Sequence, residues 1–161
     1  MLSRLPPPLH RALLRIAQPI RLRLWGLTRR EVRGCNVLAF DRVGRVLLVR
    51  HSYYQRDRWL LPGGGLAGGE DPTAAAAREL CEETGCLLES AVWAGTDLRR
   101  MPGGWTNRVE FVAGQTKGQP RADGREISEA AFFALDALPQ GTGTVVHLAL
   151  GIWWQGRGSE R

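Results

Sequence analysis

The sequence predicts an α/β (α+β) fold in which helices cover both faces of a mixed β-sheet. Two apolar runs, residues 35–40 and 45–50, flank a short turn and indicate a β-hairpin. Their near-continuous apolar character is typical of strands that are buried on both faces. Residues 72–84 and 141–154 favour helices, which supply the two covering layers of an α/β/α sandwich.

A length of 161 residues with 43% hydrophobic content predicts one globular domain with extensions. We expect a basic N-terminal extension over residues 1–33, the globular domain over 34–154 and a flexible tail over 155–161. The three cysteines form neither a disulfide set nor a paired zinc pattern, which favours a cytoplasmic compartment. The sequence has no run of 18 apolar residues and no apolar signal-peptide core, so we expect a soluble protein.

The net charge of +6 is distributed unevenly along the chain. Residues 1–33 hold eight arginines against Glu31 alone, a net charge of +7, whereas the other 128 residues carry 14 basic and 15 acidic groups, a net charge of −1. A surface that binds nucleic acid is expected to be basic. We therefore expect the globular domain to bind no nucleic acid.

The basic extension carries an apolar stripe among its arginines, and Pro19 is expected to kink or break a helix there. The pattern predicts one or two amphipathic helices. We favour packing of the apolar stripe on the domain or on the second subunit of a homodimer. Attachment to an anionic membrane surface is a weaker alternative, and disorder or an acidic partner remains open.

Two aromatic segments are candidates for substrate binding. Residues 51–59 precede a glycine-rich loop, and residues 99–105 form a predicted turn with Pro102 and a tryptophan. Exposed Trp and Tyr rings stack nucleobases. The candidate substrate-binding residues are Arg50, His51, Tyr53, Trp59 and Trp105. A structural hydrogen bond for the histidine and a packed indole for the last tryptophan are alternative interpretations.

The helix predicted over residues 72–84 has clear start and stop signals: Asp71 suits the N-cap, Pro72 the first helical position and Gly85 the C-terminal stop. We expect its core-facing side to carry Ala77, Leu80, Cys81 and Thr84. Beyond it, residues 87–94 and 108–114 indicate strands, residues 117–125 are turn-rich, and residues 126–139 close the sheet.

Three glutamates of this helix, Glu79, Glu82 and Glu83, lie at i, i+3 and i+4 and therefore share one face. Like charges at this spacing repel, and carboxylates in the last turn also oppose the helix dipole. A divalent cation would compensate, and an all-oxygen ligand set suits Mg²⁺ or Mn²⁺. A solvated charged face is the alternative, but the glycine-rich loop over residues 62–69 favours a site because its backbone approaches ligands closely.

A spaced pattern in this region resembles the Nudix box of the Nudix hydrolases; its positions are Gly64, Glu70, Arg78, Glu79, Leu80, Glu82, Glu83, Gly85 and Cys86. Only Cys86 departs from the family pattern, which usually has an aliphatic residue there, and a buried free Cys behaves as a small hydrophobe. Residues 59–63 look like the segment that leads into the box. The resemblance extends over residues 34–154 and implies the Nudix fold.

The resemblance implies hydrolysis of the diphosphate bond in a nucleoside diphosphate linked to another moiety, with Mg²⁺ or Mn²⁺. The residues that match the family's metal ligands are Glu79, Glu82, Glu83 and the Gly63 carbonyl, and Arg78 matches the residue that orients them. The general base is Glu79 or a distal carboxylate, Glu126 or Glu129, of which we favour Glu126. An ADP-ribose or nucleotide-sugar pyrophosphatase is the narrower alternative, and a non-catalytic nucleotide-binding regulator is the alternative of another class.

Overall fold

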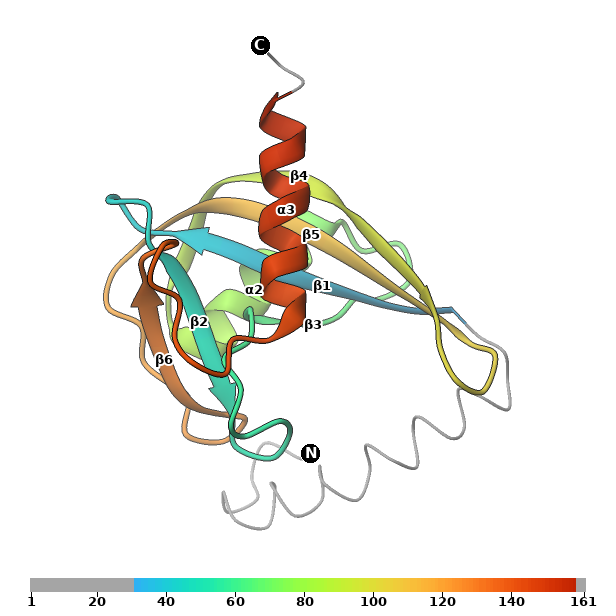
Figure 1. Cartoon of the computed structure of the whole chain (residues 1–161), viewed down its shortest axis with the longest axis horizontal. Helices are drawn as coiled ribbons and strands as arrows, with labels where there is room; N and C mark the ends of the chain where they lie inside the picture. Colours follow the sequence, from blue (N-terminus) through green and yellow to red (C-terminus); the bar gives the residue numbers. More distant parts are fainter. Residues whose placement is uncertain (1–30, 159–161) are drawn as a thin grey trace.

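Figure 1 shows the computed structural model, which describes residues 31–158 of the chain. Its elements are β1 (Glu31–Phe40), β2 (Val46–His51), β3 (Gly63–Gly65), α2 (Pro72–Thr84), β4 (Leu87–Arg100), β5 (Thr106–Lys117), β6 (Ile127–Phe133) and α3 (Thr144–Gly158). Because β1 begins at Glu31, the last three residues of the predicted extension belong to the sheet. The predictions of amphipathic helices, docking and membrane attachment for residues 1–30 lie outside the described residues.

The sheet is mixed, as predicted. Its strand order is β4-β5-β1-β2-β6, and β3 also pairs with β1. The central strand β1 runs parallel to β5 and antiparallel to β2 and β3. The predicted hairpin of β1 and β2 is confirmed, and its turn is closed by Asp41, whose Oδ1 accepts the N–H groups of Val43 and Arg45 at 3.1 and 2.8 Å.

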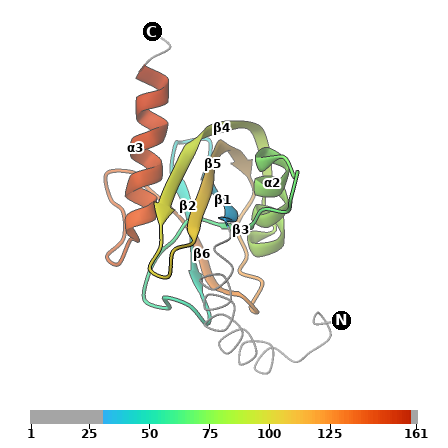
Figure 2. The same cartoon turned by 90° about the vertical axis from the view of Figure 1, so that its right-hand side faces the viewer.

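Helices α2 and α3 lie on opposite faces of this sheet (Figure 2), which confirms the predicted sandwich. Alternate residues of β1 face opposite layers. Val37 packs in the core under α2 with Ala76 and Leu80. Leu38 packs in the second core, under α3, which contains Val146. Each helix therefore covers one of two apolar clusters, as the near-continuous apolar strands require.

The bounds of two strands and of one helix differ from the sequence predictions. β4 and β5 are longer than expected because their antiparallel pairing continues to Arg100 and Thr106, so the turn between them is confined to residues 101–105. Ladder hydrogen bonds there override the polar composition on which the shorter strands were predicted. Helix α3 continues to Gly158, so it includes the first four residues of the predicted tail. No helix within residues 31–158 is long and apolar enough to cross a membrane.

Candidate functional site

Helix α2 has the bounds and caps that the sequence predicts. The Asp71 side chain accepts the backbone N–H groups of Thr73 and Ala74 at 2.9 and 3.1 Å, and Gly85 ends the helix in the left-handed conformation with φ 71°. These contacts satisfy N–H groups that the first helical turn leaves unpaired. The caps therefore fix where the glutamates of the last turns lie.

The buried face of α2 is rotated relative to our prediction. Its buried residues are Ala75, Ala76, Leu80, Glu83 and Thr84, whereas Cys81 is exposed and Ala77 is only half-buried. The prediction for Cys81 was wrong because it placed the core on the face of the helix opposite all three glutamates. The structure instead turns one of them, Glu83, toward the sheet.

Strand β3 brings two glycines against these glutamates. The Gly63 N–H donates a 3.0 Å hydrogen bond to Glu83 Oε2. A Cβ atom added to Gly64 would overlap the carboxylate of Glu79. Consecutive residues of β3 are thus flanked by carboxylates from α2. A side chain on Gly64 would block the approach of Glu79, whereas a side chain on Gly63 would collide with Cys35 and Asn36 of β1. The glycine-rich composition of this loop has a direct structural reason.

Glu83 is buried, with only 7% of its surface exposed. Burial raises the pKa of Glu83 to about 8, and the nearby charges of Glu79, Glu126 and Asp123 act in the same direction, whereas the Gly63 hydrogen bond opposes them. A carboxylate in this setting is stabilised in its charged form by a cation. The structure thus contains a buried acid with neighbouring negative charges.

Arg78 holds the outer carboxylates of the cluster. Its Nη1 lies 2.7 Å from Glu79 Oε1 and 3.7 Å from Glu82 Oε2, and its Nη2 lies 3.2 Å from Glu70 Oε1. The same Nη2 donates to the Gly65 carbonyl at 3.4 Å. The guanidinium therefore links the carboxylates of α2 to the glycine loop.

The contacts of the three glutamates, Glu79, Glu82 and Glu83, show how well the site fits a divalent cation. Within residues 31–158, no three His, Cys, Asp or Glu side chains are gathered closely enough to hold a metal ion as they stand. Glu79 is engaged by Arg78, and Glu82 is exposed on 61% of its side chain. The chemistry nevertheless fits, because the donors are hard oxygens and the buried Glu83 lies beside the Gly63 peptide.

The two distal candidates for the general base, Glu126 and Glu129, differ in their interactions. Glu129 forms a 3.1 Å ion pair with Arg50 on β2. Glu126 is among the charges that raise the pKa of Glu83. The charge of Glu126 therefore acts on the carboxylate cluster, whereas the carboxylate of Glu129 is paired with an arginine.

The predicted substrate-binding residues fall into two groups. His51 and Tyr53 lie together at the end of β2, with ring centroids 5.8 Å apart. Burial lowers the pKa of His51, and its buried Nδ1 makes no hydrogen bond within the described chain. The Arg50 guanidinium lies 4.6 Å from the centre of the Trp59 ring, so it covers this indole.

The two tryptophans do not present the open rings that the sequence suggested. Trp59 is only 7% exposed and packs edge-on against Phe133, with centroids 4.7 Å apart. Trp105 is 6% exposed, and its carbonyl closes the turn by accepting the Met101 N–H at 2.9 Å. Both indoles are packed in this conformation, which favours the alternative interpretation for Trp105. Local sequence could not show this because burial depends on tertiary neighbours.

Sequence reasoning missed two residues that shape the site. Asp123 accepts backbone N–H groups of the segment that carries Glu126, and Ser52 binds the same segment from β2. The pair Asp123-Gly124 is a turn signal that could have been used. Ser52 carried no signal, since its contact is long-range.

The pKa of Glu83 predicts a pH dependence of the metal-free protein. Because the folded-state pKa is raised from 4.5 to about 8, the folded state binds this proton more tightly than the unfolded state. The stabilising contribution is complete below the unfolded pKa and is lost as pH rises through the folded pKa. In chelator, the melting temperature of the wild type relative to Glu83→Gln is therefore expected to fall from about pH 5 to about pH 8. A pH-independent difference between the two proteins would contradict this.

The comparisons with known proteins identify the family of this chain. A family model described as the NUDIX domain matches residues 30–150. The chain therefore belongs to the NUDIX family. A solved structure, the MutT NUDIX hydrolase from Burkholderia pseudomallei, has a TM-score of 0.66 at 29% sequence identity and covers 75% of this chain and 96% of that one. The MutT protein from Methanosarcina mazei Go1 shares the fold, with a TM-score of 0.61, 20% identity and coverage of 82% and 97%.

Curated relatives give a wider range of names. "Putative 8-oxo-dGTP diphosphatase 2" of Mycobacterium tuberculosis is 37% identical over 127 residues, 73% of this chain and 82% of that protein. "NAD-capped RNA hydrolase NudC" of Vibrio cholerae is 26% identical over 105 residues, 65% of this chain. The chain spans 38% of the length of that NudC and 31% of a mouse diphosphoinositol polyphosphate phosphohydrolase, to which 52 residues are 47% identical. These relatives are hydrolases, and their substrates differ.

Proposed function

We propose that the protein hydrolyses the diphosphate bond of a nucleoside diphosphate linked to another moiety and requires Mg²⁺ or Mn²⁺. The observation that carries this proposal is the arrangement of the buried Glu83 and of Glu79 against the peptides of Gly63 and Gly64. This arrangement concentrates oxygen ligands and negative charge that a divalent cation compensates. The bound cation would neutralise charge on the diphosphate.

In this proposal Glu79, Glu82 and Glu83 bind the cation together with the Gly63 carbonyl, and Arg78 fixes the orientation of Glu79. Glu126 accepts the proton of the water that attacks phosphorus, while the bond between phosphorus and the bridging oxygen breaks and the leaving phosphate takes the electron pair. Support for Glu126 is that its charge acts on Glu83, whereas Glu129 is paired with Arg50 at 3.1 Å. His51 and Tyr53, at the end of β2, are proposed to line the substrate side of this site.

Two narrower substrate classes are consistent with the proposal. Pro102 in the turn between β4 and β5 favoured ADP-ribose or nucleotide sugars. Similarity to the mycobacterial protein favours nucleoside triphosphates with a modified base. A non-catalytic regulator is disfavoured because every metal-ligand position of the box is intact. A cytoplasmic location and a homodimer stay predictions.

The experiment that tests this function combines a substrate screen with thermal unfolding. The purified chain is incubated with ADP-ribose, nucleotide sugars, dinucleoside polyphosphates and (d)NTPs, in Mg²⁺, Mn²⁺ or chelator, and release of the monophosphate is measured. We expect turnover only with metal. A ligand that binds the folded state alone stabilises it, by about 2.7 kcal/mol at a concentration 100 times its Kd, so the melting temperature should rise with metal. Identical melting curves and no turnover in all three conditions would refute the proposal.

A further inference from the structure

The segment before β6 is organised around one carboxylate. Asp123 Oδ1 accepts three backbone N–H groups, from Arg125 at 3.0 Å, Glu126 at 3.0 Å and Ile127 at 2.8 Å. Hydrogen bonds from backbone N–H groups to an ionised carboxylate are shorter and stronger than those between neutral groups. The peptide that carries Glu126 is therefore fixed on its N–H side.

The carbonyl side of the same segment is held by Ser52, the residue that follows β2. The Ser52 N–H donates to the Glu126 carbonyl at 2.8 Å, and Ser52 Oγ donates to the Arg125 carbonyl at 2.6 Å. Ser52 is buried, with 5% of its surface exposed, so water competes little for these bonds. Donors and acceptors of the Glu126 backbone are thus both bound, by groups from two different parts of the chain.

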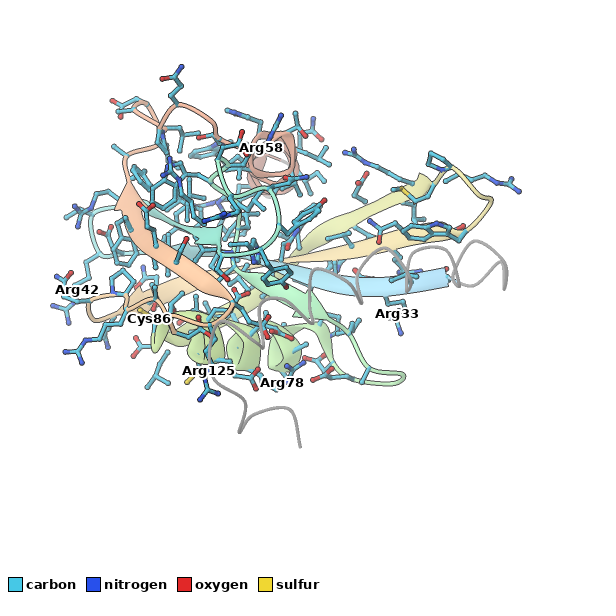
Figure 3. All side chains as sticks on the ribbon, turned by 90° about the horizontal axis from the view of Figure 1, so that it is seen from below. Arg33, Arg42, Arg58, Arg78, Cys86 and Arg125 are labelled. Carbon is cyan, nitrogen blue, oxygen red and sulfur yellow. The ribbon has the colours of Figure 1, made fainter. Side chains whose placement is uncertain are left out.

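The loop is also tied to the helix that carries the carboxylate cluster. The Arg121 N–H donates to the Thr84 carbonyl at 2.8 Å, one residue beyond Glu83. In Figure 3, Arg125 and Arg78 both lie on the α2 side of the sheet. Residues 121–127 therefore connect the end of α2 to β2 and β6, and Asp123 sits at their centre.

We propose that Asp123 is a positioning residue for Glu126, whose backbone it holds in place relative to the glutamates of α2. This inference rests on the function proposed above, in which Glu126 accepts the proton of the attacking water. Misplacement of a catalytic group by about 1 Å costs on the order of 100-fold in rate. Loss of three converging hydrogen bonds removes the constraint against such a displacement.

A second turn of the protein provides a matched control. Asp41 in the turn between β1 and β2 also accepts two backbone N–H groups through Oδ1, from Val43 and Arg45, and it lies outside the carboxylate cluster. Removing Asp41 therefore reproduces the structural cost of losing a turn carboxylate without acting on Glu126. Asp123→Asn supplies a further control, because the amide oxygen remains a hydrogen-bond acceptor.

The experiment is a double-mutant cycle on the metal-loaded full chain, with kcat, KM and melting temperature measured for each protein. The variants are Asp123→Ala, Asp123→Asn, Glu126→Gln, Asp123→Ala with Glu126→Gln, and Asp41→Ala. We expect Asp123→Ala to lower kcat about 10- to 100-fold with KM nearly unchanged. Asn should restore most of kcat, and Asp41→Ala should lower the melting temperature without loss of kcat. In the Glu126→Gln background, removing Asp123 should lower kcat less than about twofold further.

Additive losses in the cycle, or equal losses of kcat in Asp123→Ala and Asp41→Ala, would show that Asp123 acts only on the fold and would overturn the inference. A Glu126→Gln protein with full activity would also overturn it, while leaving the metal-dependent hydrolysis intact. A wild type that hydrolyses no diphosphate would instead refute the proposed function. The failures of the two proposals are thereby distinguished.

Discussion

Replacing Glu83 by glutamine is expected to lower kcat at least about 100-fold, because removal of one metal ligand withdraws about 3 kcal/mol or more of charge stabilisation, and 1.36 kcal/mol corresponds to a factor of ten. The substitution keeps the shape of the side chain, and the Gly63 N–H still finds an amide oxygen. The measurement is steady-state hydrolysis with saturating Mg²⁺ and a substrate identified by the screen.

The same substitution should not destabilise the metal-free protein. Glu83 is buried and its pKa is raised to about 8, so at pH 8 the wild type either carries a buried charge or takes up a proton. A neutral amide neither buries a charge nor takes up a proton. In chelator, Glu83→Gln is therefore expected to melt at the same temperature as the wild type or at a higher one. Mg²⁺ should raise the melting temperature of the wild type more than that of the variant.

Two comparisons make this prediction specific. Glu82→Gln should also lower kcat about 100-fold, but its effect on the metal-free melting temperature should be small because the Glu82 side chain is exposed. Glu89→Gln serves as the control, since Glu89 lies on β4 and pairs with Lys117 at 2.8 Å. A marked drop in the metal-free melting temperature of Glu83→Gln, or unchanged turnover, would contradict its assignment as a metal ligand.

Features of this structure that depend on local interactions could be predicted from the sequence, and features that depend on distant partners could not. The bounds of α2 were predicted correctly because the signals that start and end a helix are local. Here they are the N-cap Asp71, Pro72 in the first turn and the C-cap Gly85. The alternation of Val37 and Leu38 between two cores follows from the period of a strand. Pairing of β4 with β5 as far as Arg100 depends on a partner strand, and it was predicted too short.

In the candidate site, too, the local features were predictable from the sequence and the tertiary ones were not. Spacing alone brought Glu79, Glu82 and Glu83 to one region, but it could not show that only Glu83 is buried, since that depends on how α2 is rotated against the sheet. Burial of the Trp59 ring under Arg50 is likewise a tertiary effect. The charge of Glu126 acts on Glu83, 43 positions earlier in the chain, and Ser52 and Asp123 hold the segment that carries Glu126. These contacts have no local sequence pattern.

Alanine substitutions at the three glycines of β3 are expected to have three different outcomes. A Cβ on Gly63 would overlap the Cys35 carbonyl and approach the Asn36 backbone, atoms of the strand with which β3 pairs. Displacing these backbone atoms would disrupt the pairing of β3 with β1. Gly63→Ala should therefore lower the free energy of unfolding by at least about 2 kcal/mol and abolish turnover, because the strand beside Glu83 is displaced.

A Cβ on Gly64 meets different atoms. Its nearest neighbours are the three atoms of the Glu79 carboxylate group, the free end of a flexible side chain. With alanine at residue 64, the Glu79 side chain can rotate away with little loss of folding stability. It then no longer lies beside β3, and its 2.7 Å contact with Arg78 is broken. Gly64→Ala is therefore expected to retain its melting temperature within a few degrees while kcat falls at least about 10-fold.

Gly65 is the matched control within the same strand, because a Cβ there has no neighbour within 4 Å. Its contact with Arg78 uses the backbone carbonyl, which alanine retains. Gly65→Ala should therefore leave kcat and the melting temperature close to those of the wild type. Unfolding in urea and steady-state hydrolysis of all three variants give the comparison. If Gly64→Ala kept full activity, or lost as much stability as Gly63→Ala, then the Glu79 carboxylate does not depend on the open face of Gly64, and the close approach of glycine and carboxylate is not a requirement of the site.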